Sequence, residues 1–150
     1  MARKTTYIDV SPEVTWDVLA DGWQYSGWVV GSRKVRDVDA GWPAPGTRIH
    51  HSVGIGPLAW NDETEVLEAE PPHHLVLEAR LRPFATARVE LTLEAENGGT
   101  HVVMHEYPVG GPLSKLHSSV SEMLLYGRNV ESLRRLSRIV RAEASRRSRA

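Results

Sequence analysis

The chain has 150 residues and a formal net charge of −1, with 41% hydrophobic and 25% charged residues. These values are ordinary for one globular domain that is long enough to bury a core, so we expect a single domain over residues 1–150. Cysteine is absent, which excludes disulfides, thiolate metal sites and cysteine catalysis. No stretch approaches the roughly 18 apolar residues of a membrane span, and the N-terminus lacks the apolar region of a signal peptide. We therefore expect a cytoplasmic protein without integral membrane association.

The first 28 residues predict one strand followed by two short helices. Residues 3–10 alternate as a strand does. Ser11 and Pro12 are typical of a helix start, with serine as the N-cap and proline at the first helical position. This helix should run to about Ala20. The aromatic-rich segment 21–28 is broken by glycines, and it predicts a second short helix or an irregular turn.

From there to Tyr107 the chain predicts strands separated by turns. A two-residue loop at Gly56-Pro57 is compatible with a type II′ hairpin, and such a turn fixes which residues face each other. The predicted inward pairs are Ile55 with Leu58, Val53 with Trp60, His51 with Asp62, and Ile49 with Thr64. His51 and Asp62 are thus expected on the inward face beside Trp60, whereas His50, Glu63 and Glu65 should face outward.

The next strands predict the same inward face. Alternation is clean, as in an antiparallel sheet with one wet face; the expected inward residues are Leu75, Leu77, Ala79, Leu81, Ala85, Ala87, Val89, Leu91 and Leu93. Asn97-Gly98 predicts a type I′ turn, and the competing Gly98-Gly99 turn keeps the same parity. Either turn places Val102, Met104 and Glu106 inward. The small Ala85 and Ala87 leave room over that stretch.

A long amphipathic helix is predicted from Pro112 to about Arg146. Its apolar stripe has spacings of three and four and consists of Leu113, Leu116, Val120, Met123, Gly127, Val130, Leu133, Leu136 and Val140. A mid-helix glycine costs roughly 1 kcal/mol relative to alanine, so Gly127 suggests that space is wanted on the buried side.

The charge along this helix is uneven. From Arg128 onward there are eight arginines against Glu131 and Glu143. A nucleic-acid or anionic-membrane site is one interpretation. We favour a solvated helix face whose cations complement the C-terminal end of the dipole, with a frayed tail from about residue 144 and no nucleic-acid partner.

These elements resemble a known family. The run from Ser11 through Trp16, Tyr25 and Trp28, together with the closing 129–136 segment, is similar to the polyketide cyclase/dehydrase and lipid-transport family, within the START-like (SRPBCC) helix-grip superfamily. The resemblance implies an α+β fold: a curved antiparallel sheet of about seven strands wrapped around the long C-terminal helix, with two short helices after the first strand. It also implies an apolar cavity between sheet and helix. Superfamily members differ widely in function.

Three ionisable residues are candidate catalytic groups. A carboxylate beside an imidazole can orient the ring and raise its pKa, which suits His51 and Asp62 to acid–base work. A structural polar pair is the alternative interpretation. Glu106 would add a buried carboxylate that needs a partner, such as His51, Arg128 or a ligand, or else a proton. A salt bridge from Glu106 to the long helix is the interpretation we favour for that residue.

Aromatic and flexible side chains are candidate ligand contacts, because tryptophan and tyrosine present flat apolar faces with a polar edge. The predicted ligand-binding residues are Trp23, Tyr25, Trp42, Trp60, Met104, Met123 and Gly127. Trp16 and Trp28 are expected in the core. The seven histidines show no metal-binding spacing, and no P-loop, nucleophile elbow or dinucleotide motif is present, so we expect neither metal nor cofactor.

Two functions follow from this sequence, and a third is weaker. The first is a binding or carrier protein for a hydrophobic small molecule, either lipid-like, polyketide or aromatic. The second is a cyclase- or aromatase-like enzyme in which His51, assisted by Asp62, moves protons at an enolisable carbon. The third is a protein-interaction module. We expect a monomer or a homodimer.

Overall fold

The computed structural model describes residues 2–55, 57–81, 85–110 and 119–149, with side chains described for all of these except 2, 55, 81, 85 and 119–127. Its elements follow one another as β1 (Ala2–Ile8), α1 (Pro12–Leu19), the 3₁₀ helix η1 (Gly22–Gln24), α2 (Tyr25–Trp28), β2 (Ser32–Val38), β3 (Arg48–Ile55), β4 (Leu58–Glu70), β5 (His74–Leu81), β6 (Ala85–Glu96), β7 (Gly99–Gly110) and α3 (Ser119–Ser148).

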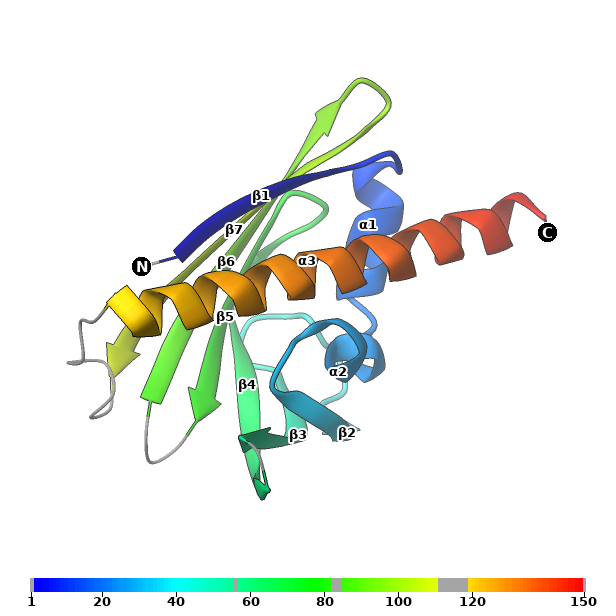
Figure 1. Ribbon diagram of the computed structural model, residues 1–150. Helices are drawn as coiled ribbons and strands as arrows, with labels where there is room; N and C mark the ends of the chain where they lie inside the picture. Colours follow the sequence, from blue (N-terminus) through cyan, green and yellow to red (C-terminus); the bar gives the residue numbers. More distant parts are fainter. Residues whose placement is uncertain (1, 56, 82–84, 111–118, 150) are drawn as a thin grey trace.

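One antiparallel sheet of seven strands carries the fold, in the order β1-β7-β6-β5-β4-β3-β2. Figure 1 shows the sheet curving behind α3, which crosses its concave side from one end to the other. The short α2 lies between α3 and β2, and α1 lies between α3 and the strands β6 and β7. The predicted helix-grip architecture is confirmed.

Local signals behave as the sequence predicts. The Ser11 side chain accepts a hydrogen bond from the Val14 amide, and Pro12 occupies the first turn of α1. Asn97 and Gly98 have φ angles of 50° and 80°, the left-handed pair that a type I′ turn requires. The predicted register of β3 with β4 is confirmed, His51 opposite Asp62 included. Glu106 lies opposite Val89 and is buried, as its predicted inward position requires. The turn residue Gly56 lies outside the described residues.

The core lies between the concave face and the C-terminal half of α3. Leu136 and Val140 are fully buried there and Leu133 is 3% exposed, against Leu91, Leu93 and Val102 from β6 and β7. Trp16 and Trp28 belong to the same core, as expected. Burying each such side chain contributes about 1.5–3 kcal/mol, so this half of the interface stabilises the fold whether or not anything is bound.

The C-terminal end of α3 differs from expectation. We expected the chain to fray from about residue 144, but the helix continues to Ser148. Glu143 accepts hydrogen bonds from Arg146 and Arg147, and Arg147 also reaches Asp17 of α1 at 3.0 Å. These contacts and the favourable position of cations at a helix C-terminus extend the last turns. The predicted start at Pro112 lies outside the described residues.

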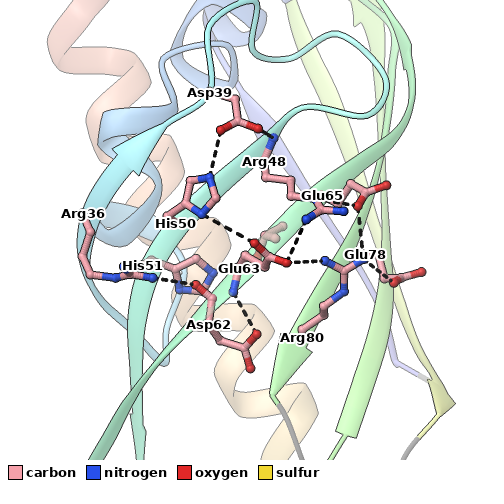
Figure 2. A network of polar contacts seen from close by, with 11 residues as sticks. Arg36, Asp39, Arg48, His50, His51, Asp62, Glu63, Glu65, Glu78 and Arg80 are labelled. Atoms are coloured by element: carbon pink, nitrogen blue, oxygen red, sulfur yellow. Dashed lines mark hydrogen bonds and ion pairs between the residues drawn. The ribbon is translucent and has the colours of Figure 1, made fainter.

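The convex face of the sheet carries a network of charges across β3, β4 and β5 (Figure 2). Arg80 contacts Glu63, Glu65 and Glu78 at 3.0–3.1 Å, and Arg48 contacts the first two of these glutamates at 2.9–3.1 Å. Desolvation raises the pKa of Glu65, but hydrogen bonds and charge from both arginines outweigh it and leave that pKa below its usual value. The outward prediction for Glu63 and Glu65 is therefore confirmed.

Arg80→Met should lower the free energy of unfolding by about 1–2 kcal/mol at neutral pH, because three ion pairs of a shared network are lost while the aliphatic stem is kept. Arg48→Met is the matched control; it loses two pairs at a more exposed position, and its effect should be smaller. Since the folded pKa of Glu65 is depressed, the stabilisation is present above its ordinary pKa and is lost as pH falls through the folded value. Urea unfolding at neutral and acid pH measures both differences; equal losses for the two variants would contradict the network.

Candidate functional site

The concave face has two parts with different surroundings. Under the C-terminal half of α3 it consists of buried apolar side chains, as described above. Towards the other end of the strands, Trp60, Ala79 and Ala87 are only half-buried. The sheet register explains their position. Thr64 pairs with Ala79 and Ala79 with Ala87, so these residues share the concave face. Trp60 lies four residues before Thr64 on β4 and therefore points to the same face. This half-buried stretch is the candidate site.

A chain of hydrogen bonds runs through the buried side of this site. The Tyr25 hydroxyl of α2 lies 3.2 Å from Thr64 Oγ1, which lies 2.9 Å from His51 Nε2. The other ring nitrogen, Nδ1, lies 3.3 Å from Ser32 Oγ, and Ser32 is 2.6 Å from Ser26 Oγ. Four elements thus meet in one polar chain. Because hydroxyls both donate and accept, they satisfy a neutral imidazole at both nitrogens.

His51 is held in its uncharged form. Burial lowers the pKa of His51 to about 4, and the nearby Asp62 carboxylate, which acts in the opposite direction, does not compensate. Asp62 acts to raise the pKa of His51, as expected, but the ring is 3% exposed and desolvation outweighs that effect, so the net shift is downward. His51 is therefore neutral at physiological pH.

The Asp62 carboxylate is also buried, opposite His51 in the sheet. It accepts a hydrogen bond from the Glu63 amide at 2.9 Å, and in Figure 2 it turns towards that amide. Both ring nitrogens of His51 are engaged by hydroxyls instead. The structure thus places His51 and Asp62 opposite each other, as predicted. The orientation of the ring, however, is fixed by Thr64 and Ser32 rather than by Asp62.

Glu106 of β7 points into the concave side and is 3% exposed. It forms an ion pair with Arg128 of α3, whose side chain is 35% exposed. Burial lowers the pKa of Arg128, and the guanidinium stays charged at neutral pH. Burial likewise raises the pKa of Tyr25, with Thr64 and the charge of Arg128 acting against that rise. The favoured salt bridge between the last strand and the helix is therefore present, beside the hydroxyl chain.

The other predicted ligand contacts occupy different surroundings. Trp23 is 59% exposed on η1, and Met104 is buried in the core at 3% exposure. Trp42 packs on the core, and its indole N–H donates to the Leu19 carbonyl at 3.3 Å, so it fastens the loop before β3 to the end of α1. Tyr25 and Trp60 lie at the candidate site. The side chains at Met123 and Gly127 lie outside the described residues.

Three polar residues of the site were not singled out from the sequence. The predicted register places Thr64 inward, but its hydroxyl partner Tyr25 comes from a helix that no register fixes. Ser32 lies next to a bulge in the pairing of β2 with β3, so its facing could not be counted from a turn. Asn129 is fully buried beside Arg128, and within the described residues its amide has no hydrogen-bond partner. A buried unpartnered amide is uncommon in native structures.

Comparison with known families decides the relationship. The family model described as polyketide cyclase / dehydrase and lipid transport matches residues 2–140, most of the chain. The chain belongs to this family. The polyketide cyclase / dehydrase and lipid transport family is the one that its sequence resembles, and its helix-grip fold agrees with that membership.

Solved structures share the fold at low sequence identity. A protein of Nitrosomonas europaea, NE0264, superposes with a TM-score of 0.71 at 17% identity over 96% of each chain. Ara h 8.0201 gives 0.69 at 10% identity, over 94% of this chain and 97% of that one. The di-domain ARO/CYC StfQ of the steffimycin biosynthetic pathway gives 0.71 at 8% identity, over 96% of this chain but 51% of that chain. No curated protein sequence matches the chain.

Among the described residues, no three histidine, aspartate or glutamate side chains gather closely enough to hold a metal ion. No helix in the described ranges combines the length and the apolar character needed to cross a membrane.

Proposed function

We propose that this protein binds a hydrophobic small molecule, of lipid-like, polyketide or aromatic character, between the concave face and α3. The observation that carries the proposal is the stretch around Trp60, Ala79 and Ala87, where the sheet presents small or flat apolar side chains that are only half-buried. Membership of a family that includes lipid transport supports it. An apolar site with a few polar groups is typical of small-molecule pockets.

The polar groups of the site favour a ligand that carries oxygen at one end. Arg128 lies close enough to Tyr25 for its charge to act on the hydroxyl, and the buried amide of Asn129 follows Arg128 on the same helix. All three can donate a hydrogen bond to a carbonyl or hydroxyl oxygen. The apolar part of the ligand would then extend along Ala79 and Ala87 towards Trp60.

Ala87→Leu should weaken binding of a hydrophobic fluorescent probe, 1-anilinonaphthalene-8-sulfonate, by roughly tenfold or more, because the larger side chain fills the proposed space. The matched control is Ala95→Leu, an exposed position on the same strand, which should leave the affinity unchanged. Fluorescence titration measures both. Equal affinity in the two variants would place the probe elsewhere. Native mass spectrometry of protein purified from its own host would then identify the natural ligand.

A cyclase-like enzyme is the second candidate, favoured by the chain of hydroxyls around His51. Neutral His51, linked through Thr64 to the Tyr25 hydroxyl, gives a route along which a proton can move between a ligand and the half-buried Ser26. Asp62 and Glu106 would act in this candidate as neighbouring charges. His51→Ala separates the two functions, since retained ligand affinity with lost turnover of a bound ketone supports the enzyme, and absence of turnover in the wild type supports the carrier.

A further inference from the structure

A groove outside the proposed ligand site runs along the edge of the sheet. It lies between β1 and α3 and has a volume of about 510 Å³. Four consecutive residues of β1, from Lys4 to Tyr7, line it. Alternate residues of a strand point to opposite faces of a sheet, so a groove that touches four in a row follows the edge of the strand.

The backbone at this edge is available for pairing. β1 is the last strand of the sheet, and within the described residues only β7 pairs with it. An edge strand presents a row of amide and carbonyl groups that can accept one more strand. Extended peptides bind proteins in this way, with main-chain hydrogen bonds supplying affinity and side-chain contacts supplying selectivity.

The opposite wall of the groove is basic. Arg134, Arg138 and Arg141 of α3 line it, and Lys4 adds a cation from β1. No acidic side chain lines this groove. Arg134 forms an ion pair with the half-buried Glu131, and Arg141 forms one with the exposed Asp9. For Arg138, no ion pair is formed with any residue in the described ranges. Val130 and Leu133 supply an apolar floor.

The spacing of the arginines matches an extended chain. Residues four apart on a helix are separated by about 6.0 Å along the axis. Alternate residues on one side of a strand are separated by about 6.7 Å. A strand lying beside β1 and carrying an acidic residue at every second position would therefore set consecutive carboxylates against Arg134 and Arg138. A nucleic-acid backbone or a lipid surface could pair with the arginines but could not add a strand to the edge of β1.

We propose that the groove between β1 and α3 binds an extended acidic segment of a partner protein, which adds a strand to β1 and places alternate carboxylates against Arg134 and Arg138. The site is independent of the ligand pocket, because it lies on the edge of the sheet rather than on the half-buried stretch of its concave face. Charged contacts here set selectivity and the rate of association, and they weaken with salt.

The test uses the full chain and a fluorescein-labelled heptapeptide in which threonine and glutamate alternate, as long as the seven residues of β1. Fluorescence anisotropy at low salt should show saturable binding, weakened roughly tenfold by Arg138→Glu. Lys34→Glu makes the same charge change on β2, at the other edge of the sheet, and should leave the affinity within about twofold. Equal weakening by both variants would reduce the effect to net charge and overturn the proposal.

Two further probes test the strand pairing itself. N-methylation of the peptide amides along one edge should abolish binding and along the other edge should be tolerated, because only one edge faces β1. Tolerance on both edges would overturn the proposal. A peptide of the same composition with its glutamates consecutive should bind more weakly than the alternating one. Tighter binding of a DNA duplex or of phosphatidylserine vesicles, lost in Arg138→Glu, would assign the groove to those partners instead.

Discussion

Lowering the pH from 7.5 to 4.5 is expected to reduce the free energy of unfolding by about 2.5 kcal/mol through His51 alone. The ring has a pKa of about 4 in the folded protein and an ordinary value of 6.5 when unfolded. Between pH 6.5 and about 4, His51 is protonated in the unfolded chain but not in the folded one, so the free energy of unfolding falls as pH falls. The loss levels off only once the pH is below the folded pKa of about 4.

The variant His51→Gln isolates this effect, because its side-chain amide can still reach Thr64 but does not titrate in this range. Urea unfolding at the two pH values should show that the variant loses about 2.5 kcal/mol less than the wild type on acidification. His101→Gln, on the outward-facing side of β7, controls for the loss of any one histidine and should keep the wild-type difference. An NMR titration of the His51 ring with a midpoint near its ordinary value would contradict the prediction.

The fold was largely predictable because hairpin turns fix strand parity. The two-residue loop at Asn97-Gly98 needs two left-handed residues, and this sequence has the pair that provides them, so every later facing on β7 follows. The same logic placed His51 opposite Asp62 and turned Glu63 outward. Ser11 and Pro12 fixed the start of α1 by the chemistry of helix capping. These are local rules, and they need no knowledge of tertiary contacts.

The site was less predictable because its contacts join elements that no turn connects. Tyr25 reaches Thr64 across 39 residues, and the Val30 amide donates to the Ser132 hydroxyl across 102. The sequence brought His51 and Asp62 into register, but it did not reveal that hydroxyls would take both ring nitrogens. Nor did it indicate the depth of burial, which is a property of the whole packed domain and which decides the direction of the His51 pKa.

Arg128→Met should cost about 2–3 kcal/mol of unfolding free energy at neutral pH, although its own side chain is 35% exposed. The cost comes from Glu106, which is 3% exposed and would be left as a buried carboxylate without its cation. Arg134→Met is the matched control, since that arginine pairs with Glu131 on the surface of the same helix. Its loss should cost less than about 1 kcal/mol.

A double-mutant cycle separates the buried charge from the lost packing. If the carboxylate causes the loss, Glu106→Gln combined with Arg128→Met should recover most of it, because a neutral amide is far cheaper to bury than an unpaired anion. Additive effects in the cycle would mean that the ion pair contributes little to stability. Arg128 would then have no structural role in the ion pair, and ligand binding would be the remaining explanation for its position beside Tyr25.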